Sequence, residues 1–153
     1  MNKRKRWILG GLGAALALLL VLGAWWLHGG PQLWTRRQFS AHRAAFANTA
    51  EAALAGEPWK NVPGVRNVNV WPKEGTEDVE LADFTTGAWG LGSSTRYWGV
   101  TYIPGDYPVG FQGTSLTGAV RSGEGWLWTE KQGDNRCYVQ RLAPCWYYYD
   151  MKF

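Results

Sequence analysis

Residues 7–27, WILGGLGAALALLLVLGAWWL, form an uninterrupted apolar stretch without a charged side chain. Its length matches the about 20 residues that one helix needs to cross the hydrocarbon core of a bilayer. Backbone amides in hydrocarbon must find their partners within the segment, so we expect a helix despite the glycines at positions 10, 11, 13 and 23. The sequence therefore predicts a transmembrane anchor over residues 7–28.

A basic cluster, KRKR at residues 3–6, stands directly before this stretch. Such clusters remain on the cytoplasmic side, and the chain after the helix then lies on the other side. We therefore expect a cytoplasmic tail at residues 1–6, a linker at 29–34 and an extracytoplasmic domain at 35–153, in a single-pass protein of the cell membrane. A cleaved signal peptide has the same basic start and apolar middle and is the alternative. The bulky Trp25 and Trp26 follow the nearest small residues and disfavour cleavage.

The charge of the chain resides in its first residues. The formal net charge is +4, but residues 1–6 contribute four positive charges, and the remainder carries 12 basic and 12 acidic side chains. Nucleic-acid binding needs a clustered basic face, so we expect no nucleic-acid partner. The anchor would instead place membrane lipid among the partners of the chain.

The chain after the anchor has the pattern of an α+β domain. Thr35 and Gln38 fit a capping box, and Phe39, Phe46 and Ala50 then lie near one face of a helix that ends at Gly56. From residue 62 onward the period changes to that of strands, most of them joined by short turns. Short connections make successive strands antiparallel neighbours. We therefore expect one amphipathic helix packed on a mostly antiparallel sheet of about five strands, behind the N-terminal transmembrane helix.

Two cysteines, Cys137 and Cys145, lie close together in the sequence. Outside the cytoplasm such a pair favours a disulfide, which would close a short loop near the C-terminus. Two independent thiols are the alternative, and they are favoured if the two side chains fall on opposite faces of their strands.

Most familiar catalytic and metal-binding patterns are absent from the sequence. His28 and His42 are the only histidines, so a zinc site or a serine-type triad in the sheet is not expected, and neither is a cofactor. Acidic residues are the remaining route to catalysis: Glu77, Asp78, Glu80 and Asp83 form a cluster, and two facing carboxylates can hydrolyse a glycoside. Solvated strand ends are the simpler interpretation of these acids. We therefore assign no catalytic residue.

Aromatic residues are unusually frequent after the anchor, with eight tryptophans and all seven tyrosines. A small core cannot easily bury them all, and exposed aromatic patches are typical of binding surfaces. Cross-strand pairing of aromatic side chains within the sheet is the alternative. Six residues could share one sheet face and form a ligand-binding site: Trp98, Tyr102, Trp126, Trp128, Trp146 and Tyr148.

A resemblance to a known group of proteins rests on four segments: 97–106 (YWGVTYIPGD), 111–113 (FQG), 133–135 (GDN) and 146–150 (WYYYD). Together they resemble a pattern in small uncharacterised single-span proteins of bacteria, chiefly Gram-positive ones. The resemblance covers most of residues 95–153. It implies a membrane-anchored domain of unknown function and no catalytic residues.

The sequence thus predicts a membrane-anchored binding or interaction domain without enzymatic activity. Its aromatic sheet face would take a glycan, a peptide or a protein of the cell envelope. A small carboxylate-based hydrolase of the envelope and an accessory subunit of a membrane complex are the alternatives.

Overall fold

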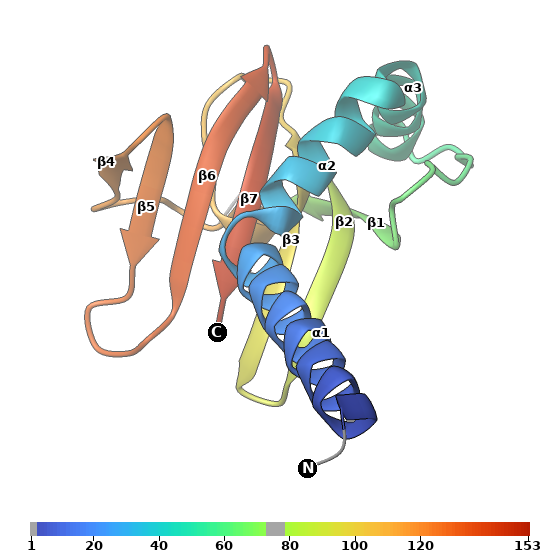
Figure 1. The fold of residues 1–153 in the computed structure, drawn as a ribbon. Helices are drawn as coiled ribbons and strands as arrows, with labels where there is room; N and C mark the ends of the chain where they lie inside the picture. Colours follow the sequence, from blue (N-terminus) through green and yellow to red (C-terminus); the bar gives the residue numbers. More distant parts are fainter. Residues whose placement is uncertain (1–2, 73–78) are drawn as a thin grey trace.

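The computed structural model describes residues 3–72 and 79–153. In this part of the chain, helices precede a sheet (Figure 1). The elements are α1 (Lys3–His28), α2 (Gly30–Ala41), α3 (Arg43–Leu54), β1 (Asn67–Pro72), β2 (Val79–Leu91), β3 (Ser94–Tyr102), the single-turn helix η1 (Phe111–Gly113), β4 (Val120–Ser122), β5 (Gly125–Thr129), β6 (Arg136–Ala143) and β7 (Trp146–Lys152).

The described strands form one antiparallel sheet in the order β1-β2-β3-β7-β6-β5-β4. Strands β1 to β3 and strands β4 to β7 are two meanders, in each of which successive strands pair antiparallel. Pairing of β3 with β7 joins them, so the C-terminal strand lies in the middle of the sheet. The predicted fold is wrong in the number of strands, because the sheet has seven strands and not about five. The three-residue strand β4 lies in a glycine-rich stretch and is too short to show alternation.

The helix α2 begins at Gly30, so residues 30–34 are helical. Pro31 occupies the first turn, where a missing amide hydrogen costs nothing because that amide has no partner within the helix. Thr35 lies inside α2 and does not cap a helix. Its buried hydroxyl lies 2.8 Å from the hydroxyl of Thr86 in β2 and ties the helix to the sheet. The chain bends at His42, and α3 begins directly after it at Arg43.

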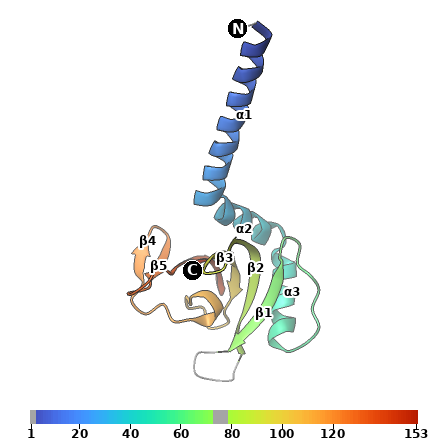
Figure 2. The ribbon, with the colours of Figure 1, turned by 90° about the horizontal axis from the view of Figure 1, so that it is seen from below.

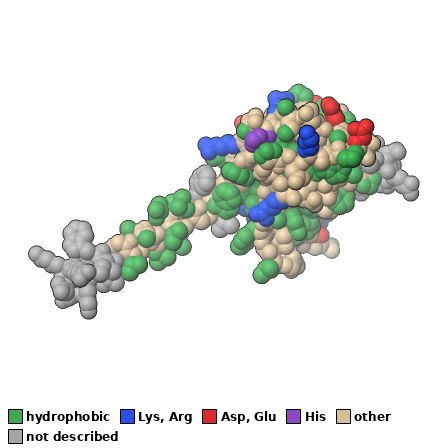
Figure 3. All heavy atoms as spheres, turned by 90° about the vertical axis from the view of Figure 1, so that its right-hand side faces the viewer, with side chains coloured by type: hydrophobic (Ala, Val, Ile, Leu, Met, Phe, Trp, Pro, Cys, Tyr) green, Lys and Arg blue, Asp and Glu red, His purple; other side chains and the backbone are tan. Residues whose placement is uncertain are grey.

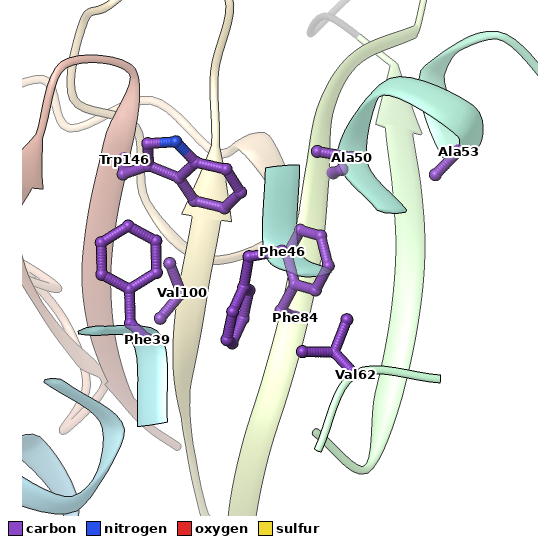
Figure 4. Packing of buried hydrophobic residues seen from close by; sticks show 9 residues of the cluster. Phe39, Phe46, Ala50, Ala53, Val62, Phe84, Val100 and Trp146 are labelled. Carbon is purple, nitrogen blue, oxygen red and sulfur yellow. The ribbon is translucent and has the colours of Figure 1, made fainter. Parts of the chain in front are cut away.

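The helices α2 and α3 cover one face of the sheet, which we call the helix face (Figure 1). Phe39 and Phe46 point from the two helices toward Phe84 and Trp146 of the sheet (Figure 4). The ring centroids of Phe46 and Phe84 lie 5.0 Å apart, and those of Phe39 and Trp146 lie 5.1 Å apart. Ala50 of α3 is also fully buried, and its small side chain lets the helix approach the strands closely.

The opposite face is covered partly by the connection between β3 and β4, which includes η1. We call it the loop face. Its core is a second cluster of buried side chains in which Phe111 of η1 packs against Tyr149 of β7, with ring centroids 5.4 Å apart. Residues Leu81, Ile103 and Val139 are fully buried in the same cluster.

The helix α1 projects away from the sheet and its covering helices (Figure 2). Hydrophobic side chains lie along the projecting segment (Figure 3), and residues 11–24 are all exposed. Judged on the described residues, none of the helices is both long and apolar enough to cross a membrane. By this finding, the predicted anchor at residues 7–28 and the single-pass localisation in the cell membrane are wrong.

The predicted disulfide between Cys137 and Cys145 is also wrong, because both cysteines are free thiols. Cys137 lies near the start of β6, and Cys145 lies in the turn after that strand. The intervening strand rises about 3.3 Å per residue, so the two ends lie roughly 20 Å apart, whereas bonded cysteines have Cα atoms within about 7 Å. Burial also raises the pKa of the Cys137 thiol to about 12, which keeps it protonated.

Candidate functional site

The most unusual side chain of the sheet is a buried carboxyl group, Asp83 of β2. It pairs in register with Asn69 of β1 and Thr101 of β3, and its side chain points to the loop face. Asp83 is 1% exposed, and its Oδ1 atom has no hydrogen-bond partner among the described residues. Burial raises the pKa of this carboxyl group to about 7, although a hydrogen bond from Tyr149 lowers it in part. A buried acid that titrates near neutral pH is typical of functional sites.

Tyr149 of β7 connects this carboxyl group to the centre of the sheet. Its hydroxyl group donates to Asp83 and lies 3.1 Å from the hydroxyl of Thr85. Burial raises the pKa of Tyr149 well above its usual value, so the phenol stays protonated and remains a donor. The strand β3 has a glycine where the tyrosine crosses it. A Cβ atom on Gly99 would lie 2.8 Å from the Tyr149 hydroxyl oxygen and 2.2 Å from the carbonyl oxygen of Phe84.

Asp83 lines a pocket of about 470 Å³ on the loop face, which we call the Asp83 pocket. One wall is aromatic and consists of Tyr97, Phe111 and Phe153. The rings of Tyr97 and Phe111 are stacked with centroids 5.3 Å apart, and Phe153 meets both edge to face. These contacts fix the rings in place, so the wall is formed before any ligand arrives.

The rim of the Asp83 pocket is polar. Arg66, Asn67, Asn69 and Gln112 contribute to its lining. The Nδ2 atom of Asn67 donates to Oδ1 of Asn69 over 3.2 Å, which orients both amides along the same strand. Gln112 has a φ of 57°, a left-handed conformation that is uncommon for residues other than glycine. Amides and guanidinium groups at this rim offer both donors and acceptors to a ligand.

The six residues predicted to bind a ligand do not form one surface. Trp98, Tyr102, Trp146 and Tyr148 point to the helix face, whereas Trp126 and Trp128 point to the loop face. Trp98, Trp146 and Tyr148 are buried, and the other three are half-buried. None of the six lines the Asp83 pocket. Their role in binding stays a prediction.

The predicted acidic cluster is divided between the two faces. Glu80 and Asp83 are three residues apart in β2, so alternation directs their side chains to opposite faces. Glu77 and Asp78 lie outside the described residues. Within the described residues, no group of three or more potential metal-ligating side chains lies close enough together to hold an ion.

No pattern in the sequence assigns Asn67 or Asn69 to a site. Asp83 was noted as one acid among several. Its neighbours Ala82 and Phe84 point to the opposite face of β2, so they do not indicate that Asp83 is buried. The residues of the β3–β4 connection that complete the pocket carry no pattern that assigns them to it.

No protein-family model, curated protein or solved structure matches this chain.

Proposed function

We propose that the chain is a non-catalytic binding domain that takes a sugar or a similar polyhydroxylated ligand in the Asp83 pocket. One observation supports this function above all, namely the unpaired Oδ1 atom of Asp83. A buried acceptor without a partner costs about 1–3 kcal/mol. Because Oδ1 is covered in the unliganded protein, we infer that the side chains around it shift on binding, so that a ligand hydroxyl can donate to it and remove that cost.

The remaining lining fits the same class of ligand. Sugar hydroxyls are both donors and acceptors, and so are the amides of Asn67, Asn69 and Gln112 taken together. The electron-rich faces of aromatic rings attract the weakly positive C–H bonds of a sugar ring. The volume of about 470 Å³ falls within the range of small-molecule sites.

The alternative function, carboxylate-based hydrolysis, has weaker support. Glycoside hydrolysis needs two carboxyl groups on either side of the scissile bond. Asp83 is the one acidic side chain among the described residues that line the pocket. Its high pKa suits a general acid, but the described lining supplies no partner carboxylate. Binding therefore accounts for more of the geometry than catalysis does.

The proposed function predicts a pH-dependent affinity. A ligand hydroxyl that donates to Asp83 favours the ionised carboxylate, so binding lowers the pKa of this group from its free value of about 7. The affinity for a bound sugar is then expected to rise as the pH increases from 5 toward 7 and to level off above it. Calorimetric titration with a panel of mono- and disaccharides at pH 5, 6, 7 and 8 measures this dependence.

Two variants separate this explanation from a general effect of pH. Asp83→Asn keeps the shape of the side chain but cannot ionise, so the pH dependence should disappear and affinity at pH 8 should fall about tenfold, the equivalent of one hydrogen bond to a charged group. Asp134→Asn makes the same change in an exposed turn and should bind as the unmodified protein does. The proposal fails if no saccharide binds, or if Asp83→Asn binds a saccharide with unchanged affinity and pH dependence.

A further inference from the structure

A second pocket lies on the helix face, near the end of the sheet where β7 ends. Its volume is about 420 Å³, and its lining comes from β2, β3, β5, β6 and β7. Because the lining residues point to the face opposite the Asp83 pocket, the two pockets are separated by the thickness of the sheet. We call this second site the cationic pocket.

Three basic side chains form a row across the cationic pocket. Arg96 of β3 pairs in register with Lys152 of β7, and Lys152 pairs in register with Arg136 of β6. Neighbouring strands are about 4.8 Å apart, so the three side chains leave the sheet side by side. Trp89 continues the row, because it pairs with Arg96 on the next strand.

Only one of these positive charges is compensated. The Nε and Nη2 atoms of Arg96 donate to the two carboxylate oxygens of Asp150 over 2.7 and 2.5 Å. The hydroxyl of Tyr148 also donates to Asp150, over 3.1 Å. Within the described part of the chain, neither Arg136 nor Lys152 forms an ion pair. The pocket therefore carries an excess of two positive charges.

Such an arrangement opposes folding. Like charges that lie directly opposite each other on neighbouring strands destabilise a sheet, and Arg136 and Lys152 are such a pair. An anion between them would turn this repulsion into attraction. A phosphate group carries close to two negative charges at neutral pH, and its oxygens match the planar donors of arginine.

The cationic pocket also has an apolar side. Trp89 is 67% exposed, and Leu127 on the other side of the pocket is half-buried. A ring or other flat group attached to the phosphate would cover the indole of Trp89. We propose that the cationic pocket binds the phosphate group of a small phosphomonoester whose organic part stacks on Trp89.

Thermal unfolding tests this proposal with two probes, inorganic phosphate and phenyl phosphate, at pH 7.5. Each is added at a few millimolar, and sodium chloride holds the ionic strength constant. We expect both probes to raise the midpoint of unfolding, and phenyl phosphate to raise it more. Trp89→Ala should remove the difference between the probes and keep the response to inorganic phosphate.

Variants that remove one positive charge from the cationic pocket provide a second test. Arg136→Gln and Lys152→Gln should each raise the unfolding midpoint in chloride alone, because the repulsion is relieved, and each should lose most of the increase caused by phosphate. Arg37→Gln removes the same charge from an exposed position of α2 and should keep the full response to phosphate. General stabilisation of proteins by phosphate would act equally on all variants. The proposal is overturned if chloride gives the same increase as phosphate, or if the double variant Arg136→Gln/Lys152→Gln still responds.

Discussion

Replacing Asp83 by asparagine is expected to stabilise the protein at pH 8 by about 4 kcal/mol and to leave its stability at pH 4 nearly unchanged. The carboxyl group loses its proton near pH 3.8 in an unfolded chain and near pH 7 in the folded protein, because burial disfavours the charged form. Between these values the folded protein binds more protons than the unfolded chain. The free energy of unfolding therefore falls as the pH rises through this window, and the loss is complete above pH 7.

Urea denaturation from pH 4 to pH 8 measures this effect as the difference between the variant and the unmodified protein. Taking the difference removes the contributions of all other titrating groups. Asp134→Asn, in an exposed turn, is the matched control and should follow the unmodified protein at every pH. Parallel curves for Asp83→Asn and the unmodified protein would show that Asp83 is solvated, and the description of the site would then be incorrect.

Truncating Phe46 to alanine is expected to cost about 3–5 kcal/mol of unfolding free energy. Phe46 is fully buried, and its ring contacts Phe39, Phe84 and Trp146, so its removal leaves a cavity between α3 and the sheet (Figure 4). Small domains have about 5–15 kcal/mol of stability in total, and a loss of this size removes a large part of it.

The same urea denaturation, at pH 5, measures the effect of Phe46→Ala. Leu91→Ala is the matched control, because Leu91 is 91% exposed and its truncation should change stability by less than about 0.5 kcal/mol. A loss below 1 kcal/mol for Phe46→Ala would mean that α3 does not pack on β2 as described.

The local sequence pattern predicted which face of a helix or strand each residue occupies better than it predicted how the helices and strands are arranged. Val68 and Val70 alternate with Asn67 and Asn69, and the structure places the valines on the helix face and the asparagines on the loop face. Gly56 was expected to end a helix, and it follows the end of α3 with a φ of 71°. Such features depend on neighbours in the sequence, so residue spacing alone predicts them.

The predictions that were wrong concern features that depend on segments far apart in the sequence. The central position of β7 requires pairing with β3, about 50 residues earlier, and no local signal specifies that partner. The aromatic patch was predicted on one face because the strand order was unknown. With the observed order, Trp126 and Trp98 lie on opposite faces. The Asp83 pocket is likewise completed by Phe111, which comes from the connection between β3 and β4 and is far from Asp83 in the sequence.

The central claim, that the Asp83 pocket binds a polyhydroxylated ligand, is tested most directly by nuclear magnetic resonance. Backbone and side-chain amide resonances of the labelled protein are followed while saccharides are added at pH 8. We expect the largest shifts at Asn67, Asn69, Thr85 and Tyr97, which line the pocket. Absence of shifts with any saccharide, or shifts centred on Trp126 and Trp128 instead, would contradict the claim.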